Sequence, residues 1–357
     1  MPTIHDVAQR ADVSIATVSR VLNGNARVSE ESRRRVWEAA AELDYWPNSA
    51  ARSLTMRRTH VFGVLLPDLY GEFFSEIIRG IDHAARRQRF QVLLSSSHAD
   101  TGTVLAAARA MRGRIDGLIM MAPDVESTEA VETIRRRFPM VLLNPRAPMP
   151  PCDSVSIANF EGARAATRHL VSLGHRVIAM LRGPGGNVDA EERLRGYRDG
   201  LREAGLEMSA ARELPGDFTE SCGFQRAAAL LNLEPRPTAI VCANDSMAIG
   251  LISALASRGL DVPRDLAVVG FDDVAISRFV TPALTTVRVD AQGLGRQAVE
   301  LMLSREEPSL KVPPKHEVLP APLVVRRSCG STSVDLDPTD APRRRRDDPR
   351  PHVPPTR

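Results

Sequence analysis

The first two dozen residues constrain the fold of this chain more than any other stretch. Thr3 and Asp6 stand at the spacing of a helix N-cap and its acidic capping-box partner. That helix is expected to stop near Asp12, and Ser14 is expected to cap a second one. Each helix has apolar residues at helical spacing: Val7, Ala8 and Ala11 in the first, and Val18, Val21 and Leu22 in the second. Because so few residues separate them, the two helices must cross steeply, as in a helix-turn-helix.

The second helix presents an outer face of mostly small or polar residues. That face consists of Ile15, Ala16, Thr17, Ser19 and Arg20. Short side chains let a helix lie deep in the DNA major groove, and an arginine can bond a guanine edge through two hydrogen bonds. The pattern therefore indicates a DNA-reading helix, although spacing alone leaves open a solvated surface on a small helical cap.

The residues that follow favour the DNA-binding interpretation. A third helix is predicted from Ser29 to about Leu43, with Glu30 and Glu31 at its positive end. Together the N-terminal motifs resemble those of the lactose/galactose-repressor (LacI/GalR) family of bacterial transcription regulators. The matching positions are Ile4, Asp6, Val7, Ala8, Val13, Ser14, Thr17, Val18, Ser19, Arg20, Val21, Leu22, Asn23, Tyr45, Pro47, Asn48, Ala51, Arg52 and Leu54.

This resemblance implies an all-α helix-turn-helix headpiece over residues 2–56 that ends in a hinge helix at about residues 48–55. The hinge is too short to be stable alone in water, so it would order only when a dimer and DNA bring two copies together. Leu54 would then wedge into the minor groove and kink the site. The expected DNA-binding residues are Thr3, Ser14, Ile15, Ala16, Thr17, Ser19, Arg20, Asn23, Asn48, Ala51, Arg52 and Leu54.

Composition limits the alternatives. The net charge is only +3 over 357 residues, so any attraction to nucleic acid must come from local patches. No stretch has the apolar length of a membrane span, and the N-terminus lacks the apolar core of a signal peptide, so a cytoplasmic location is expected. Neither a metal nor a cofactor is expected, because the cysteines are scattered without ligand spacing: Cys152, Cys222, Cys242 and Cys329.

From Val61 onward, apolar strands alternate with amphipathic helices, which predicts doubly wound parallel sheets. Strands are predicted at 61–66, 91–94, 117–121, 140–143, 177–180, 239–242 and 266–270. Helices are predicted between them at 73–88, 103–112, 127–137, 160–173, 190–204, 220–231 and 245–258. The series is too long for one sheet and divides near Asn159.

The resemblance implies a periplasmic-binding-protein-like core over residues 61–328, with two parallel-sheet subdomains joined by three crossings. One subdomain would take residues 61–159 and 290–320, and the other 160–289 and 321–328, ending with the segment Leu323–Arg326. Residues 329–357 are rich in Ser, Asp, Pro and Arg and are expected to form a disordered tail.

In open parallel sheets, ligands sit beyond the carboxyl ends of the strands. Aromatic, amide, carboxylate and guanidinium side chains follow several of the predicted strands. They suit a small polyhydroxylated ligand, because rings stack on sugar C–H patches while polar groups bond hydroxyls. The candidate effector contacts are Phe73, Asn144, Arg193, Phe218, Asn244 and Asp272, of which all but Asn144 match family effector contacts by resemblance.

Each candidate also has a structural alternative. Phe73 can cap the core, Arg193 can lie on a solvated helix face, and Asp272 can close a turn. One stretch departs from the family pattern, since many relatives carry an Asp-Asn pair where this chain has Ser-Ile-Ala-Asn at 156–159. That change is expected to place apolar groups near the cleft and predicts a ligand different from those of the best-known members, or weak binding.

Catalytic motifs are missing from the sequence. It contains neither a Gly-Lys-Ser/Thr phosphate loop nor a Gly-x-Ser-x-Gly nucleophile turn, so an enzyme is not expected. The sequence predicts a homodimeric regulator, most simply a repressor, that binds double-stranded DNA at a near-palindromic operator. A small-molecule effector, a sugar or sugar derivative, would control its affinity allosterically. Control by a protein corepressor, or a solute-binding receptor in place of a regulator, are the alternatives.

Overall fold

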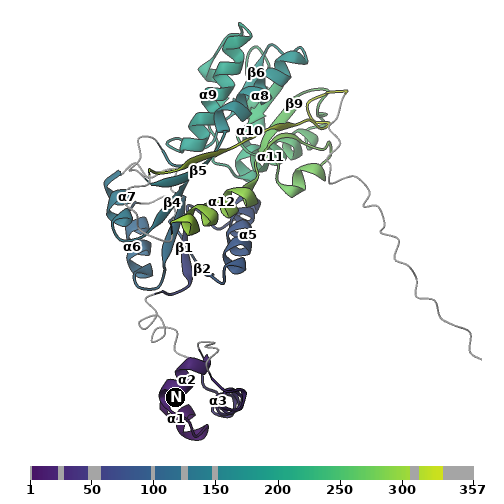
Figure 1. Cartoon of the computed structure of the whole chain (residues 1–357). Coiled ribbons are helices and arrows are strands. Elements are labelled where there is room, and N and C mark those ends of the chain that lie inside the picture. The colour runs from purple at the N-terminus through teal and green to yellow at the C-terminus, as the bar shows by residue number, and fades with distance from the viewer. Residues whose placement is uncertain are drawn as a thin grey trace, which may run out of the picture.

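The computed structural model describes residues 2–22, 28–46, 58–97, 101–121, 128–146, 152–305 and 313–332. Its N-terminal part is helical, with α1 (Ile4–Arg10), α2 (Ile15–Leu22) and α3 (Glu30–Glu42) (Figure 1). The capping box predicted at the start of α1 is confirmed. Asp6 N donates to Thr3 Oγ1 over 3.4 Å, and Thr3 N donates to Asp6 Oδ2 over 2.7 Å.

The three helices share one small core. Val7, Val18 and Val36 are fully buried, one from each helix. Between α1 and α2 the chain turns at Asp12, whose φ of 50° is left-handed. Arg35 on α3 secures that turn, because its Nε donates to the carbonyl of Ala11 over 2.9 Å. The turn between α1 and α2 is thus held by apolar contacts and by a C-terminal cap supplied from the third helix.

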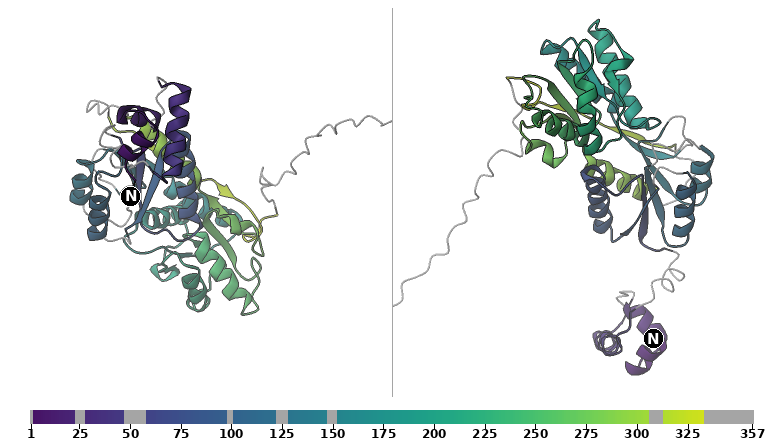
Figure 2. Two further views of the ribbon diagram at one scale, coloured as in Figure 1. Left: turned by 90° about the horizontal axis from the view of Figure 1, so that it is seen from below. Right: turned by 180° about the vertical axis from the view of Figure 1, so that it is seen from behind.

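The rest of the described chain builds two six-stranded sheets. In the first, the strand order is β11-β5-β4-β3-β1-β2 and the pairs are parallel. Its strands are β1 (Val61–Leu66), β2 (Gln91–Ser96), β3 (Gly117–Met121), β4 (Met140–Leu143), β5 (Asp153–Ile157) and β11 (His316–Leu319). Helices α5 (Glu72–Arg87) and α12 (Ala291–Ser304) cover one face, and α6 (Thr101–Met111) and α7 (Thr128–Arg135) cover the other (Figures 1 and 2).

The second sheet has the order β12-β10-β9-β8-β6-β7. Its strands are β6 (Ile178–Leu181), β7 (Glu213–Leu214), β8 (Ala239–Cys242), β9 (Ala267–Asp272), β10 (Thr285–Arg288) and β12 (Leu323–Val324). It is flanked by α8 (Asn159–Ser172) with α9 (Val188–Glu203), and by α10 (Glu220–Leu231) with α11 (Asp245–Ala256). We call the unit around the first sheet lobe 1 and the unit around the second sheet lobe 2. The antiparallel pairing of β12 with β10 differs from the all-parallel sheet expected.

The chain passes between the lobes three times: from β5 into α8, from β10 into α12, and from β11 into β12. The second passage returns α12 to lobe 1, where it packs on α5. Two glycines allow this approach, since a Cβ at Gly80 would overlap the backbone oxygen of Gln292, and one at Gly295 that of Ile77. Larger side chains at either position would force the two helices apart.

Four strands were not predicted from the sequence: β5, β7, β10 and β11. The first and third contain buried polar residues that broke the apolar pattern. Asp153 in β5 is 5% exposed and accepts from Arg305 Nε over 2.5 Å, and Thr285 and Thr286 in β10 are fully buried. The strand β7 is only two residues long, and β11 has exposed alternate residues at the sheet edge.

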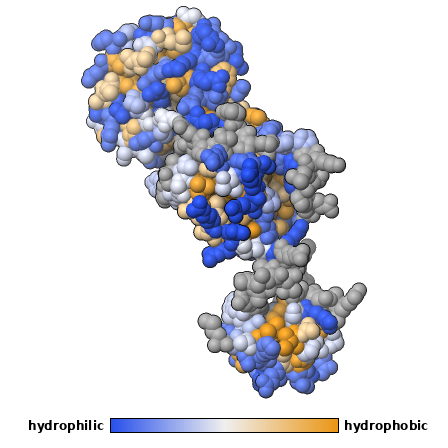
Figure 3. All heavy atoms as spheres, turned by 90° about the vertical axis from the view of Figure 1, so that its left-hand side faces the viewer, coloured by the Kyte–Doolittle hydropathy of each residue, from blue (hydrophilic) through white to orange (hydrophobic). Residues whose placement is uncertain are grey.

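The expected start of the tail at Cys329 is too early. Cys329 is 1% exposed, and its Sγ lies 3.3 Å from His169 Nε2, so the packed core extends at least to this residue. The remainder of the predicted tail from residue 333, and the hinge predicted at about residues 48–55, lie outside the described residues. Within the described ranges, no helix combines the length and hydropathy that crossing a bilayer requires. Hydrophilic residues cover most of the described surface of both lobes on the face shown in Figure 3.

Candidate functional site

The exposed side of α2 carries the predicted DNA-reading residues. Ile15 is 41% exposed, although it is a large aliphatic residue, and Ala16 and Arg20 are also exposed while Val18 and Val21 face the core. Ser14 accepts from Thr17 N over 3.1 Å, so its hydroxyl caps the helix and fixes the first turn. The result is a short exposed ridge with one guanidinium at its end, of a width that a major groove admits.

Of the other predicted DNA contacts, some lie within the described residues and some outside them. Thr3 is exposed at the cap of α1, and Thr17 and Ser19 are half-buried on α2. The remaining residues lie outside the described part of the chain: Asn23, Asn48, Ala51, Arg52 and Leu54.

A second site lies between the lobes and is organised around Arg193 on α9. This side chain is 3% exposed, and each of its nitrogens is directed at an oxygen of the protein. Nε donates to Asn159 Oδ1 over 2.8 Å, Nη1 donates to the carbonyl of Ala243 over 2.5 Å, and Nη2 lies 3.2 Å from Asp272 Oδ1. The guanidinium also stacks 3.8 Å above the ring of Phe271. Arg193 is therefore a buried hub and not a residue on a solvated helix face.

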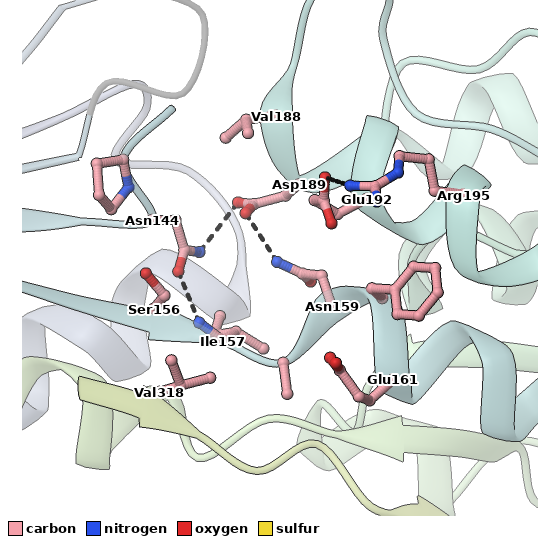
Figure 4. A pocket seen from close by; sticks show the side chains of 13 residues that line it. Asn144, Ser156, Ile157, Asn159, Glu161, Val188, Asp189, Glu192, Arg195 and Val318 are labelled. Atoms are coloured by element: carbon pink, nitrogen blue, oxygen red, sulfur yellow. Dashed lines mark hydrogen bonds and ion pairs between the residues drawn. The ribbon is translucent and has the colours of Figure 1, made fainter. Parts of the chain in front are cut away.

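The carboxylate of Asp189 joins this hub to lobe 1. Asn159 Nδ2 donates to Asp189 Oδ1 over 2.8 Å, and Asn144 Nδ2 donates to Asp189 Oδ2 over 3.1 Å (Figure 4). Asn144 follows β4 in lobe 1 and also accepts from Ile157 N over 2.9 Å, whereas Asp189 belongs to α9 in lobe 2. A continuous chain of polar contacts thus crosses from one lobe to the other.

A second polar link crosses between the lobes beside the first. Arg146, two residues after Asn144, forms an ion pair with Glu191 over 3.1 Å and donates to the carbonyl of Gly186. On another part of the junction, Ala275 N donates to Glu72 Oε1 over 2.6 Å, so lobe 2 also contacts the start of α5. The lobes are held by a few directional contacts, which a change in lobe angle would have to break.

Burial perturbs the acidic groups near Arg193. It raises the pKa of Asp272 to about 6, although Arg193 opposes the shift and Asp189 adds to it. Burial likewise raises the pKa of the fully buried Asp245 well above its ordinary value, and the neighbouring charge of Asp272 adds to that shift. Asp245 accepts from Thr286 Oγ1 over 2.6 Å. Carboxyl groups held this far from water mark the junction as an electrostatically unusual place.

Three of the predicted effector residues have a left-handed backbone. The φ angles are 45° at Asn144, 70° at Phe218 and 110° at Asp272. Such conformations in residues other than glycine cost about 1–3 kcal/mol each and concentrate at functional sites. Asn144 follows β4, Phe218 comes after β7, and Asp272 is the last residue of β9.

The remaining two candidates are held by structural contacts. Asn244 is the N-cap of α11: its Oδ1 accepts from Met247 N over 3.0 Å, and its Nδ2 donates to the carbonyl of Phe218 over 2.9 Å. Phe73 is half-buried at the start of α5, with its ring edge-on to Phe74 at a centroid distance of 5.4 Å. The ring of Phe218 lies 6.0 Å from the Arg193 guanidinium.

A hollow of about 340 Å³ opens at this junction. Side chains of both lobes contribute to it, and the carboxylate of Asp189 points between the amides of Asn144 and Asn159 (Figure 4). The residues that line it are Asn144, Pro145, Ser156, Ile157, Ala158, Asn159, Phe160, Glu161, Val188, Asp189, Glu192, Arg195 and Val318. Of the six predicted effector contacts, Asn144 lines the hollow, and Arg193 and Asp272 stand behind it through Asn159.

Comparison with known proteins identifies both parts of the chain. Residues 3–48 match the model of bacterial regulatory proteins of the lacI family, and residues 167–329 match that of a periplasmic binding protein-like domain. The chain is 34% identical over 311 residues to the HTH-type transcriptional repressor PurR of Aliivibrio fischeri (strain MJ11), covering 85% of this chain and 92% of that protein. It is also 34% identical to the ribose operon repressor of Escherichia coli (strain K12), covering 87% and 95% of the two chains. The chain belongs to the LacI family.

Solved structures agree with this assignment. The Lac repressor dimer bound to operator and the anti-inducer ONPF superposes with a TM-score of 0.82 at 32% identity, covering 92% of this chain and 99% of that one. A transcriptional regulator CelR–cellobiose complex superposes with a TM-score of 0.70 at 30% identity, covering 92% and 100%. As a LacI-family protein, the chain is a DNA-binding transcriptional regulator with the two-lobed core that its sequence predicts.

Sequence reasoning missed two residues of this LacI-family cleft, Asn159 and Asp189. The stretch that ends at Asn159 was expected to make the cleft more apolar, but Asn159 is 4% exposed and bonds both Asp189 and Arg193. Asp189 follows the N-cap Asn187 by two residues, where an acidic side chain is ordinarily explained by the helix dipole. The sequence feature that could have identified Asp189 is its position four residues before Arg193, which places both side chains on one face of α9. Among the described residues, no group of three or more His, Cys, Asp and Glu side chains is arranged to hold a metal ion.

Proposed function

We propose that this chain is a cytoplasmic repressor that binds a near-palindromic operator as a homodimer and whose affinity is set by a small ligand between its lobes. The observation that carries the proposal is the combination of an exposed reading helix with a polar network that crosses the lobe junction, from Asn144 through Asp189 and Asn159 to Arg193 and Asp272. The first feature supplies DNA recognition and the second supplies a site whose occupancy alters lobe geometry.

The reading helix supports a division of labour on DNA. Ile15, Ala16 and Arg20 are the exposed residues that we assign to base edges in the major groove. Hydroxyls and amides at Thr3, Ser14, Thr17, Ser19 and Asn23 are assigned to register, on phosphates and base edges. The hinge residues Asn48, Ala51, Arg52 and Leu54 are assigned to the minor groove, where two copies would order together on the operator.

The cleft supports a sugar or sugar derivative as effector. Asn144 and Asp272 supply polar groups at strand ends, and Arg193 supplies a guanidinium from α9. Phe218 and Phe73 supply aromatic faces, with Asn244 positioning the loop of Phe218. The cellobiose complex and the ribose operon repressor among the similar proteins are consistent with a carbohydrate. Since a bound effector changes the contacts between the lobes, it would change the separation of the two hinge segments and hence operator affinity, with a typical coupling of about 1–3 kcal/mol.

The surface around the lobe junction supports a dimer. Tyr70 is 77% exposed beside α5, and Phe279 is 73% exposed after the 3-10 helix η2 (Ala275–Arg278). The bond from Ala275 N to Glu72 brings these two segments together. Leu69 and Ile276 on the same two segments are also exposed, and neighbouring apolar side chains of this kind are typical of an interface. A twofold axis here would pair both lobes with their counterparts.

Operator selection from random duplex DNA tests the proposal. Purified full-length protein is expected to enrich sequences with an inverted repeat, and a mixed-protomer experiment should show two protomers on each site. A library of sugars and sugar derivatives is then screened for ligands that change the affinity for the enriched operator. Binding to all duplexes with equal affinity would show that the headpiece has no reading function.

A further inference from the structure

The hollow at the lobe junction contains more carboxylates than cationic groups. Its lining includes Glu161, Asp189 and Glu192, while Arg195 is the guanidinium among the lining residues described and forms an ion pair with Glu192. The nearby pairs Arg193–Asp272 and Arg146–Glu191 are each balanced. The space that a ligand would occupy therefore lies in a negative field, which favours positive or neutral ligands and disfavours anions.

The hydrogen bonds of the cleft point to the same conclusion. Its amide and guanidinium donors are already directed at protein oxygens, from Asn144 and Asn159 to Asp189 and from Arg193 to three separate acceptors. The lining of the hollow can accept more hydrogen bonds from a ligand than it can donate. An ionised carboxylate offers about four acceptor positions, and three carboxylates, those of Glu161, Asp189 and Glu192, line the hollow. A ligand that completes these contacts has to donate.

From these observations we infer that the cleft is specific for a ligand rich in hydrogen-bond donors, a neutral or amino-substituted polyol, and that it rejects phosphorylated and carboxylate analogues. Asp189 and Glu161 determine this specificity. The inference rests on the proposed effector role of the cleft and adds the chemical class of the effector. Hydroxyl and ammonium groups donate to carboxylates, whereas a phosphate or carboxylate would place its negative oxygens against the carboxylates of Glu161 and Asp189, while the amide and guanidinium donors are already bonded to protein oxygens.

The size of the hollow agrees with such a ligand. Its volume of about 340 Å³ lies at the small end of the range of about 300–1,000 Å³ for ligand pockets. Asp189 is the central group, since the residue is 7% exposed and its carboxylate is held by amides from both lobes. A donor from the ligand would compete with Asn144 for Asp189 Oδ2, so recognition and the link between the lobes depend on the same oxygen. Glu161 is exposed at the rim and adds charge without joining the network.

Matched ligands that differ only in charge test this inference on the full chain. Thermal denaturation is followed with glucose, galactose and ribose, with glucosamine and galactosamine, and with the corresponding sugar phosphates and gluconate. At least one neutral or amino member is expected to raise the melting temperature, and its phosphorylated analogue to bind about tenfold more weakly or worse. Tighter or equal binding of a phosphate overturns the inference, and so does the absence of stabilisation by every neutral and amino member.

Two variants and a control test which residues determine the selectivity for a neutral sugar over its phosphate. Glu161→Gln removes a rim charge outside the network and is expected to narrow the gap between a neutral sugar and its phosphate by about threefold or more. Asp189→Asn is expected to weaken all ligands, because Asn144 and Asn159 would then face an amide donor. Glu207→Gln is the control, since Glu207 is 77% exposed and absent from the lining. An unchanged gap in both cleft variants overturns the assignment of these residues.

Operator selection without ligand separates this inference from the proposed function. If operator binding is intact and a phosphorylated sugar controls it, the chemical class assigned here is wrong while the regulator role stands. If no operator is found, the proposed function fails before the cleft is considered.

Discussion

Replacing Arg193 by methionine should destabilise lobe 2 strongly at neutral pH. Methionine keeps an unbranched chain in place of the aliphatic part of Arg193 but removes the positive charge that faces Asp272. The Asp272 side chain is 8% exposed. Removing one partner of a buried ion pair costs about 3–5 kcal/mol, because the other charge is left uncompensated. The loss of donors to Asn159 Oδ1 and the Ala243 carbonyl adds to this cost, so we expect a decrease of about 4 kcal/mol or more in the free energy of unfolding.

A double-mutant cycle separates this electrostatic effect from lost packing. Asp272→Asn in the Arg193→Met background removes the uncompensated carboxylate and should restore about 2 kcal/mol or more. Urea unfolding of the wild-type protein, both single variants and the double variant at one protein concentration measures the coupling free energy. If Arg193→Met lost less than about 1 kcal/mol, or if the two changes were simply additive, the pair would not be the buried hub inferred here.

Further predictions test other parts of the structure. Burial raises the folded-state pKa of Asp272 from 3.8 to about 6. Its contribution to the free energy of unfolding is therefore fully present below pH 4, and about 3 kcal/mol of it is lost as the pH rises through 6. Asp272→Asn should flatten that part of the curve of unfolding free energy against pH. Thr3→Ala should destabilise the headpiece by about 1 kcal/mol, seen as a lower melting temperature, because it removes the cap over Asp6 N. Arg20→Ala should weaken operator binding by about 1–3 kcal/mol and relax the preference at one base pair, and a uniform loss over all operator variants would indicate a phosphate contact instead. Arg146→Leu should change the response to an effector while ligand-free operator selection keeps the same sequence preference, since Arg146 contacts Glu191 across the lobes.

The sequence predicted the headpiece well because its signals are local. Capping, helical spacing and a short turn all act within a few residues, and the structure contains the predicted box between Thr3 and Asp6. Central strands were predicted where they are continuous apolar runs, as in β3 and β8. The strands β5 and β10 were not predicted because Asp153, Thr285 and Thr286 are buried polar residues. Their partners, Arg305, Arg326 and Asp245 respectively, come from distant parts of the chain.

The cleft was predicted in outline for a different reason. Polar residues at strand ends identified Asn144 and Asp272, because parallel strands bring their carboxyl ends to one edge, and the family resemblance identified Arg193 on α9. Asp189 and Asn159 lie on helices, where their side chains have ordinary explanations in capping and amphipathicity. Only the folded chain shows that these two residues connect the others.

Under the proposed function, the first turn of α9 is where ligand binding would be coupled most directly to lobe movement. Asp189 and Glu191 lie in that turn, and each contacts a residue that follows β4 in the other lobe, Asn144 and Arg146 respectively. Because both contacts join the same two short segments, a change in lobe angle that breaks one must strain the other. A ligand that takes over the Asp189 oxygen from Asn144 would therefore weaken both links at once. Two separate and distant contacts would respond independently, whereas these two contacts would be lost together when a ligand changes the lobe angle.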